Sequence, residues 1–314
     1  MKAVVLTEFG APDMLVVQDV PTPAIGDNDV LVRVKAAGIN PVDVKTRQGK
    51  AFANQLKEHQ PLILGWDISG EVVEAGASVT TFKPGDAVFG MVNFPGYGAA
   101  YAEYVATPAA HLTHKPANIT HEEAAAATLA ALTACQALVD KAHLQKGQKI
   151  LIHAAAGGVG HYAVQLAKHL GAYVIGTSSA ANRDFVLSLG ADEHIDHNNQ
   201  RFEDVVQDAD VVLVATLADN TKDRSVDTVK PGGTLVSILS GLSGESADKA
   251  AAKGLRVEAF LVASNGEQMQ QLAQLLAAGT IRSEVSMAVP VEQISEAHRQ
   301  VETGKTRGKV VVTF

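Results

Sequence analysis

The segment from Lys149 to Ala172 reads KILIHAAAGGVGHYAVQLAKHLGA, and it decides the interpretation of the whole chain. Its first residues are apolar and β-branched, its centre is rich in glycine, and its second half repeats apolar residues at helical spacing. A strand that passes through a glycine turn into a helix is typical of a dinucleotide-binding turn, where backbone N–H groups approach a pyrophosphate.

The small residues of this segment have nearly the spacing that such a turn requires. Ala155, Gly157 and Gly160 occupy the three positions of G-x-G-x-x-G, with alanine in first place, and Gly158 adds a further glycine. The predicted helix begins at about Val159, and further strands and helices alternate after it. We expect these five residues to bind a dinucleotide. The alternative is a glycine-rich turn without a ligand.

The end of the next strand indicates which dinucleotide to expect. An acidic residue there would bind the ribose 2′-hydroxyl of NADH, but this strand ends in GTSSAANRD, starting at Gly176. Thr177, Ser178 and Ser179 supply hydroxyls and Arg183 supplies a guanidinium, which suit a 2′-phosphate. We expect these four residues to bind NADPH. The alternative is that the serines only cap the following helix and that Arg183 is solvated.

Length and composition narrow the class of protein. The 314 residues suffice for about two domains. The net charge of -8 and the lack of a dense basic run predict no nucleic-acid partner. The one cysteine forms no internal disulfide. Neither a signal peptide nor an apolar segment of about 18 residues is present, so we expect a cytoplasmic protein without a membrane span.

Two patterns divide the chain. Residues 1–120 form short β-rich runs between turn signals and predict a twisted antiparallel sheet or partial barrel. Residues 121–274 alternate apolar strands with helices, which predicts a doubly wound parallel sheet. The stretch from Thr120, a good N-cap, to Leu144 predicts one long helix. Residues 275–314 return to the first pattern, so we expect the second domain to be inserted into the first.

Besides AAAGGVG, further motifs stand along the chain: AAGINPVDVKTRQG (36–49), LGWDISGEVVEAG (64–76), FKPGDAVFG (82–90), YAEYVA (101–106), LTACQAL (132–138) and GKVVVTF (308–314). Together they resemble the motifs of the medium-chain dehydrogenase/reductases, in the zinc-free quinone oxidoreductase branch near the enone and alkenal reductases. The resemblance covers nearly the whole chain. It implies a Rossmann NADP-binding domain inserted into a GroES-like, mainly antiparallel β domain, and a homodimer.

Departures from the zinc alcohol dehydrogenases of the same superfamily predict that no zinc is bound. Those enzymes carry a cysteine where Asn40 stands and a His-Glu pair where Trp66 and Asp67 stand. A structural zinc site would need four cysteines, and this chain has only Cys135, which we interpret as a core thiol.

The histidines do not change this prediction. His111/His114 and His194/His197 have i, i+3 spacing, but without further ligands nearby we interpret both pairs as solvated loop residues. His153 lies in the first Rossmann strand and is expected to be buried with its hydrogen bonds satisfied.

The predicted absence of a metal limits the substrate. Without a Lewis acid, the alkoxide formed from an ordinary ketone lacks strong stabilisation. Quinones and α,β-unsaturated carbonyl compounds delocalise the charge themselves, and the resemblance implies the same substrate classes. We expect hydride transfer from the nicotinamide to such an acceptor, with the protein positioning the substrate and excluding water.

Three residues are candidates for catalysis. The Asn40 amide is expected to donate to the substrate oxygen or the cofactor ribose; alternatively it is a turn residue before Pro41. Lys45 is expected to stabilise an enolate oxygen, or else to form an ion pair with Asp43. Tyr97 is a candidate lid aromatic that stacks on a flat acceptor, or else packs against the sheet.

The remaining cofactor contacts come mainly from the resemblance. It implies that Thr133 lies near the nicotinamide and phosphates, and that a basic side chain near the end of the chain reaches the cofactor. Backbone groups after two Rossmann strands are expected to hold the carboxamide. These candidates are Arg307 and Lys309 for the basic side chain, and Ile238, Leu239, Leu261 and Val262 for the carboxamide.

Three other functions stay open at this point. The first is a zinc-type alcohol dehydrogenase, and the second is an enoyl-thioester reductase of the same branch, which would need a basic entrance for a carrier phosphate. The third is a non-catalytic structural or regulatory protein that binds NADPH.

Overall fold

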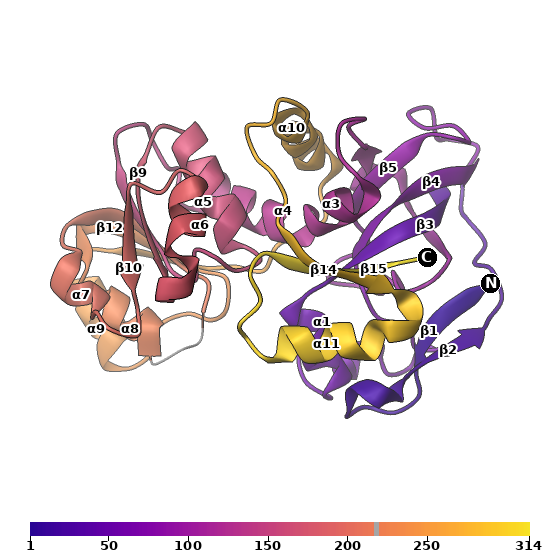
Figure 1. The fold of residues 1–314 in the computed structure, drawn as a ribbon, viewed down its shortest axis with the longest axis horizontal. Helices are drawn as coiled ribbons and strands as arrows, with labels where there is room; N and C mark the ends of the chain where they lie inside the picture. The colour runs from indigo at the N-terminus through magenta and orange to yellow at the C-terminus, as the bar shows by residue number, and fades with distance from the viewer. Residues whose placement is uncertain (217–219) are drawn as a thin grey trace. The chain divides into compact units, whose positions relative to one another are not determined.

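The computed structural model describes residues 1–216 and 220–314, which form two units (Figure 1). Met1–Leu132 together with Ala263–Phe314 form the first unit, and Thr133–Val262 form the second. The second unit is inserted into the first, but its boundaries lie further inside the chain than 121 and 274. The reason is packing: α3 (His121–Ala126) packs on β3 and β4, and α10 (Gly266–Ala277) packs on β7, all in the first unit.

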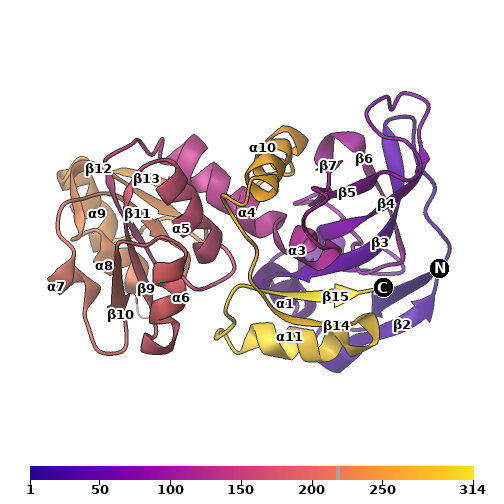
Figure 2. The same ribbon diagram turned by 45° about the horizontal axis from the view of Figure 1, so that its top comes forward.

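The second unit contains six parallel strands in the order β10-β9-β8-β11-β12-β13. In chain order this is 3-2-1-4-5-6, the arrangement of dinucleotide-binding domains. Figures 1 and 2 show α5 and α6 on one face of the sheet and α8 and α9 on the other. The elements are β8 (Lys149–Ile152), α5 (Gly160–His169), β9 (Tyr173–Ser178), α6 (Arg183–Ser188), β10 (Glu193–Asp196), α7 (Phe202–Val205), β11 (Ala209–Val214), α8 (Thr221–Ser225), β12 (Val229–Ser237), α9 (Glu245–Ala252) and β13 (Arg256–Ala259).

Apolar strands explain why this sheet is covered on both faces. Leu151, Ile175, Val212 and Leu235 come from four neighbouring strands, and all are at most 4% exposed within one apolar cluster. Strands that are apolar on both sides must bury both faces, which requires a helix layer on each. The predicted doubly wound parallel sheet is confirmed.

The first unit contains a mainly antiparallel sheet in the order β14-β15-β3-β4-β5-β7, with β6 also paired to β3. Only β14 and β15 pair in parallel. This confirms the predicted GroES-like domain class. The strands are β1 (Lys2–Leu6), β2 (Leu15–Asp19), β3 (Asp29–Ile39), β4 (Asp67–Ala75), β5 (Ala87–Met91), β6 (Tyr104–Pro108), β7 (Thr113–His114), β14 (Val285–Pro290) and β15 (Lys309–Thr313).

The other helices of this unit are short or lie at its edge. They are α1 (Pro41–Arg47), α2 (Ala53–Leu56) and α11 (Ile294–Glu302), the last of which packs on β15. Within the two described ranges of the chain, no helix has both the length and the apolar character that crossing a membrane would require.

The single helix predicted from Thr120 to Leu144 is wrong in one respect, because the structure divides it. Thr120 is the N-cap as predicted, and its Oγ1 accepts from Glu123 N at 3.2 Å. The chain then forms α3, α4 (Leu129–Cys135) and a π-helical segment, η3 (Gln136–Lys141). The break after α3 occurs where Leu129 N donates to Asp67 Oδ1 at 3.0 Å.

Candidate active site

The glycine turn connects β8 to α5 at the carboxyl edge of the parallel sheet. Ala154 reverses the chain with a φ of 52°, in the left-handed region. Gly160 packs so closely on this turn that an added Cβ would lie 2.1 Å from Ala154 O. Only glycine fits there, and it lets the helix start directly against the turn.

The open side of the turn presents three consecutive backbone N–H groups, those of Gly158, Val159 and Gly160. None of them donates a hydrogen bond within the described part of the chain. Val159 is the N-cap of α5 and provides no side-chain cap. A Cβ at Gly157 would meet only Ala154, whose carbonyl oxygen lies 3.2 Å away. Unpaired N–H groups at a helix N-terminus attract anions, so the turn fits the pyrophosphate of a dinucleotide.

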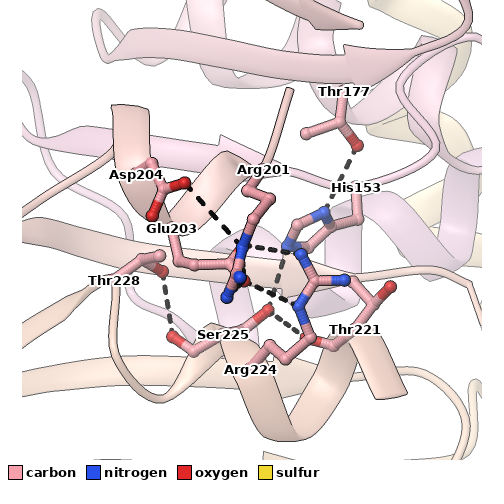
Figure 3. Close-up of polar contacts among 9 residues, drawn as sticks. All are labelled: His153, Thr177, Arg201, Glu203, Asp204, Thr221, Arg224, Ser225 and Thr228. Atoms are coloured by element: carbon pink, nitrogen blue, oxygen red, sulfur yellow. Dashed lines mark hydrogen bonds and ion pairs between the residues drawn. The ribbon is translucent and has the colours of Figure 1, made fainter. Parts of the chain in front are cut away.

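His153 follows β8 and lies at the centre of a buried polar cluster (Figure 3). Its Nδ1 lies 3.3 Å from Thr177 Oγ1, and its Nε2 lies 3.0 Å from Ser225 Oγ. Burial, and next the charge of Arg224, lower the pKa of His153 to about 3. The imidazole is therefore neutral, and the prediction of a buried, satisfied histidine is confirmed.

The proton positions in this cluster follow from its acceptors. Ser225 Oγ lies 2.6 Å from the carbonyl oxygen of Thr221, which can only accept, so the one proton of Ser225 goes there. Ser225 then accepts from His153, which places the ring proton on Nε2. Nδ1 is left as an acceptor, and Thr177 donates its hydroxyl proton to it. Thr177 therefore has no proton left for a ligand.

An ion-pair group holds α7 and α8 together beside the histidine (Figure 3). Arg224 binds both carboxylate oxygens of Glu203, at 2.9 and 2.6 Å, and this pairing holds the pKa of Glu203 down at about 2. The Arg224 guanidinium also lies 4.7 Å from the ring centre of Phe202, whose ring is edge-on to His153. The pair thus supports the ring that packs on His153.

Ser178, Ser179 and Arg183 differ in how accessible they are beyond β9. Ser178 is buried, and its Oγ lies 2.8 Å from His194 Nε2. Ser179 is the N-cap of the next short helical turn but makes no capping bond, and its hydroxyl donates to no residue within the described ranges. The Arg183 side chain is 62% exposed and lies 3.5 Å from Asp184. Ser179 and Arg183 are therefore the groups here that are free to contact a phosphate.

The residues predicted to hold the carboxamide lie at the same edge of the sheet, after β12 and β13. Ile238 N donates to Val214 O at 3.3 Å. Leu239 and Leu261 are 37% and 55% exposed, whereas Val262 is buried. Dinucleotides bind at the carboxyl ends of the strands in parallel sheets of this kind, and these residues lie there. A contact of these residues with the carboxamide stays a prediction.

Asn40 lies between β3 and α1 and forms a buried cluster with Asp67 and Lys309, which we call the Asn40 cluster. Asn40 Nδ2 donates to Asp67 Oδ2 at 2.8 Å, and Asn40 Oδ1 accepts from Lys309 Nζ. Lys309 Nζ also donates to Ile39 O at 3.1 Å and lies 3.5 Å from Asp67 Oδ2. The three side chains are at most 3% exposed. The bonds of Lys309 thus stay inside the first unit, whereas the sequence left open whether Arg307 or Lys309 contacts the cofactor.

Asp43 closes the first turn of α1. Its Oδ2 accepts from Asn40 N at 2.6 Å, and the Asp43 side chain is fully buried. Burial, and next the charge of Asp67, raise the pKa of Asp43 to about 7. No ion pair joins Asp43 to Lys45 in the part of the chain that the structure describes, so the alternative role considered for Lys45 is not observed.

Tyr97 is held in place at both its hydroxyl and its ring. The hydroxyl donates to Pro61 O at 2.8 Å and accepts from Ile63 N at 3.1 Å. The ring stacks on His59, with centroids 3.9 Å apart and planes 6° apart. One face of the ring is therefore covered, and a role in stacking on a substrate stays a prediction for the other face.

Thr133 and Arg307 are less defined as cofactor ligands. Thr133 is buried in α4, and Arg307 is half-buried just before β15. Both make polar interactions within the protein. Their contacts with a cofactor stay predictions.

The described side chains offer no donor set for a metal ion. Among residues 1–216 and 220–314, no three His, Cys, Asp or Glu side chains are grouped so that they could hold a metal ion. Cys135 is buried, and burial raises the pKa of its thiol to about 11, as suits a core thiol. The description of the four histidines as solvated loop residues is wrong for at least two of them, because His194 lies on β10 and bonds Ser178, and His111 accepts from Asn93 N.

Sequence reasoning did not assign Asp67 and Ser225 to any site. The signal for Asp67 is a carboxylate at the start of a strand whose first four residues are buried, where a charge must be paired. Ser225 carries no comparable signal, because its role depends on the position of His153, 72 residues earlier.

Comparisons with known proteins agree with this architecture. Residues 26–117 match the model of the alcohol dehydrogenase GroES-like domain, and residues 189–312 match that of the zinc-binding dehydrogenase domain. The chain is 35% identical to the 2-methylene-furan-3-one reductase of Solanum lycopersicum and 34% identical to the chloroplastic NADPH-dependent alkenal/one oxidoreductase of Arabidopsis thaliana, covering 99% of this chain and 79% of each relative. The quinone oxidoreductase of Coxiella burnetii superposes with a TM-score of 0.93 at 37% identity, over 100% of this chain and 99% of the other.

The chain belongs to the medium-chain dehydrogenase/reductase superfamily. This class is defined by the six-stranded dinucleotide-binding domain inserted into a GroES-like domain, and by relatives that match 99% of the chain. Within that superfamily its relatives place it in the branch of the quinone oxidoreductases and alkenal/one reductases, as the sequence motifs predicted.

Proposed function

We propose that this protein is an NADPH-dependent reductase of quinones and α,β-unsaturated carbonyl compounds. The observation that carries the proposal is the turn of Gly158, Val159 and Gly160, whose three unpaired N–H groups fit a pyrophosphate. Relatives that match 99% of the chain are named as a 2-methylene-furan-3-one reductase, an alkenal/one oxidoreductase and a quinone oxidoreductase. The relative from Arabidopsis thaliana is named as NADPH-dependent, which supports a nicotinamide cofactor.

The preference for NADPH over NADH rests on two groups beyond β9. The exposed guanidinium of Arg183 and the hydroxyl of Ser179 are free to bind a 2′-phosphate, and an Arg–phosphate contact is both charge-assisted and bidentate. Thr177 does not contribute a proton, because it donates to His153. The 2′-phosphate preference is therefore proposed for Ser179 and Arg183 in particular.

For the reduction itself, the protein has to position the substrate and to supply one hydrogen-bond donor to the substrate oxygen. The reduced nicotinamide, when bound, supplies the hydride. Asn40 keeps one N–H that no described residue uses, and this N–H is suited to donate to a carbonyl oxygen as negative charge develops there. Lys45 and Tyr97 stay candidates for a second contact. The Asn40, Trp66 and Asp67 side chains do not form a zinc-binding set, so we expect acceptors that delocalise the charge themselves.

A panel of acceptors tests this function. Purified protein is assayed by NADPH oxidation with quinones, 2-alkenals, cyclic enones, enoyl thioesters and saturated ketones, and then with NADH. We expect turnover of the conjugated acceptors, faster with NADPH, and no measurable turnover of saturated ketones. Equal rates with saturated ketones would contradict the proposed substrate class. A preference for enoyl thioesters would favour an enoyl-thioester reductase. Tight NADPH binding without turnover would favour a non-catalytic structural or regulatory protein.

Two further parts of the proposal rest on the resemblance and the sequence. A homodimer is expected from the family, and a cytoplasmic location from the sequence. Sedimentation equilibrium of the purified protein tests the first part, since a monomer at micromolar concentration would contradict it.

A further inference from the structure

The Asn40 cluster is assembled from three adjacent strands of one sheet. β15, β3 and β4 are neighbours in that order, so Lys309 and Asp67 lie on the two sides of the end of β3, where Asn40 follows. Val310 pairs with Ile39, and Asp67 pairs with Gly38. The sheet register therefore places a cation on one side of Asn40 and an anion on the other.

Gly38 leaves the space that the carboxylate occupies. A Cβ at this position would lie 2.9 Å from Asp67 Oδ2 and 2.9 Å from Ala125 O. Because both contacts are tighter than real Cβ atoms adopt, any larger residue would displace the Asp67 carboxylate or the C-terminal end of α3. The glycine in β3 therefore leaves room for the Asp67 carboxylate to contact Asn40.

The hydrogen bonds of Asp67 show that it acts as an acceptor at both oxygens. Oδ1 accepts from Leu129 N at 3.0 Å and Oδ2 accepts from Asn40 Nδ2 at 2.8 Å. An ionised carboxyl has this pattern, and the Lys309 ammonium 3.5 Å away compensates its charge. A buried carboxylate without such a partner would be strongly destabilising.

All the hydrogen-bond donors of the Lys309 ammonium are also paired inside the protein. Its ammonium has three protons, and the structure gives it three oxygen partners: Ile39 O, Asn40 Oδ1 and Asp67 Oδ2. At 3% exposure, Lys309 has no donor left for a substrate or cofactor.

These partners fix the orientation of the Asn40 amide. An ammonium can only donate and a carboxylate can only accept, so Oδ1 must face Lys309 and Nδ2 must face Asp67. Rotating the amide by half a turn would set NH₂ against NH₃⁺ and oxygen against carboxylate. One N–H of Nδ2 is left over, and its direction is determined by the other two contacts.

We infer that Asp67 and Lys309 are positioning residues for the proposed reductase reaction: they hold the Asn40 amide so that its remaining N–H points at the substrate oxygen. The inference rests on the proposed function, because it gives Asn40 a substrate to contact. It assigns Lys309 to the substrate side and not to the cofactor. Neither Asp67 nor Lys309 touches the reacting atoms.

A double-mutant cycle tests this inference. The variants are Asn40→Ala, Lys309→Met and their combination, each assayed for kcat and KM with a conjugated acceptor and for NADPH affinity by cofactor fluorescence. We expect Asn40→Ala to lower kcat by about 10²-fold and Lys309→Met by at least about tenfold, with NADPH affinity unchanged. In the Asn40→Ala background, Lys309→Met should cost no further activity, because it acts through Asn40.

A second cycle covers the case in which Lys309→Met does not fold. Asp67→Asn combined with Lys309→Met removes both buried charges together, and this pair is again compared with and without Asn40→Ala. Lys115→Met is the matched control, because Lys115 Nζ also holds backbone carbonyls in the first unit, those of Pro116 and Ile119, but is not bonded to Asn40. It should keep the kcat of the unmodified protein.

The outcomes separate the inference from the proposed function. If Lys309→Met, or the double variant, lowers kcat as much in the Asn40→Ala background as in the unmodified protein, then its role is general stability and the inference is overturned, while the reductase function stands. The inference also fails if Asn40→Ala keeps full kcat. If none of the proteins, the unmodified one included, reduces a conjugated acceptor, then the proposed function has failed.

Discussion

The role of a polar residue in this protein depends on which neighbour takes its proton. Thr177 and Ser179 are hydroxyl residues two positions apart, yet Thr177 donates to His153 while Ser179 donates to no residue in the described ranges. A hydroxyl that has already donated inside the protein can only accept from a ligand. A phosphate offers only acceptor oxygens at neutral pH, so Ser179 suits it and Thr177 does not.

The first residue-level prediction concerns Arg183. Replacing Arg183 by Ala should lower the ratio of kcat/KM for NADPH to kcat/KM for NADH by about tenfold, because a charge-assisted hydrogen bond contributes about 1.5–3 kcal/mol. Steady-state kinetics with both cofactors measure the ratio. Arg299→Ala is the matched control, since Arg299 is a partly exposed arginine that pairs with Asp13 and Glu296 in the first unit. An unchanged ratio in Arg183→Ala would show that the 2′-phosphate binds elsewhere.

Thr177 gives the complementary prediction. Thr177→Val should leave the cofactor ratio unchanged but lower the free energy of unfolding by about 1–3 kcal/mol, because His153 Nδ1 would be buried without a donor. Urea unfolding and the same kinetic ratio measure the two effects. A large fall in the ratio would mean that Thr177 donates its proton to the 2′-phosphate and that the hydrogen-bond directions assigned around His153 are reversed.

Among the secondary-structure elements, the segment after Thr120 shows how a distant residue changes local structure. The composition from residue 120 to 144 favours a continuous helix, and the cap at Thr120 forms as expected. Leu129 N nevertheless bonds to the Asp67 carboxylate, 62 residues earlier in the chain. A charge-assisted bond to a buried carboxylate is stronger than a helical one, so the helix restarts at α4.

The prediction at this scale concerns the cap of α3. Thr120→Ala should lower the free energy of unfolding by about 1 kcal/mol, because it removes the side-chain half of the reciprocal capping pair with Glu123. Urea unfolding measures this loss. The control is Thr280→Ala, at an exposed threonine outside any helix, which should change stability by less than about 0.5 kcal/mol. Equal effects of the two substitutions would argue against the cap.

For the molecule as a whole, each unit carries a buried neutral histidine. His153 lies in the second unit and His298 in the first, and burial lowers the pKa of both to about 3. Between pH 6.5 and 3 the unfolded chain binds protons at these positions and the folded chain does not. Stability is therefore lost as the pH falls below 6.5, by about 2 kcal/mol per histidine at pH 5.

Unfolding experiments between pH 7.5 and 4.5 measure this dependence. His298→Phe should reduce the loss of stability in acid for the first unit. Burial also lowers the pKa values of the half-buried His111, His121 and His194, so these residues add losses of the same sign.

Asp43 acts in the opposite direction, since its pKa is raised to about 7 and the folded state holds its proton more tightly than the unfolded chain. Asp43→Asn should therefore steepen the acid loss. A flatter profile in Asp43→Asn would contradict that sign.

The amino-acid sequence alone predicts the two kinds of sheet, the insertion of one unit into the other, the glycine turn and the N-cap at Thr120. These features depend on steric rules and on periodicities within a few residues, which can be read locally. It also placed Asn40 among the candidate residues, although through resemblance and not through geometry.

The roles of the polar groups depend on tertiary contacts between residues far apart in the chain. Asn40, Asp67 and Lys309 are separated by 27 and 242 residues, and Ser225 is 72 residues from His153. The direction of an amide, or the position of a hydroxyl proton, depends on whether a donor or an acceptor lies opposite. Sheet register and helix packing bring that partner into place, so no local pattern in the chain specifies it.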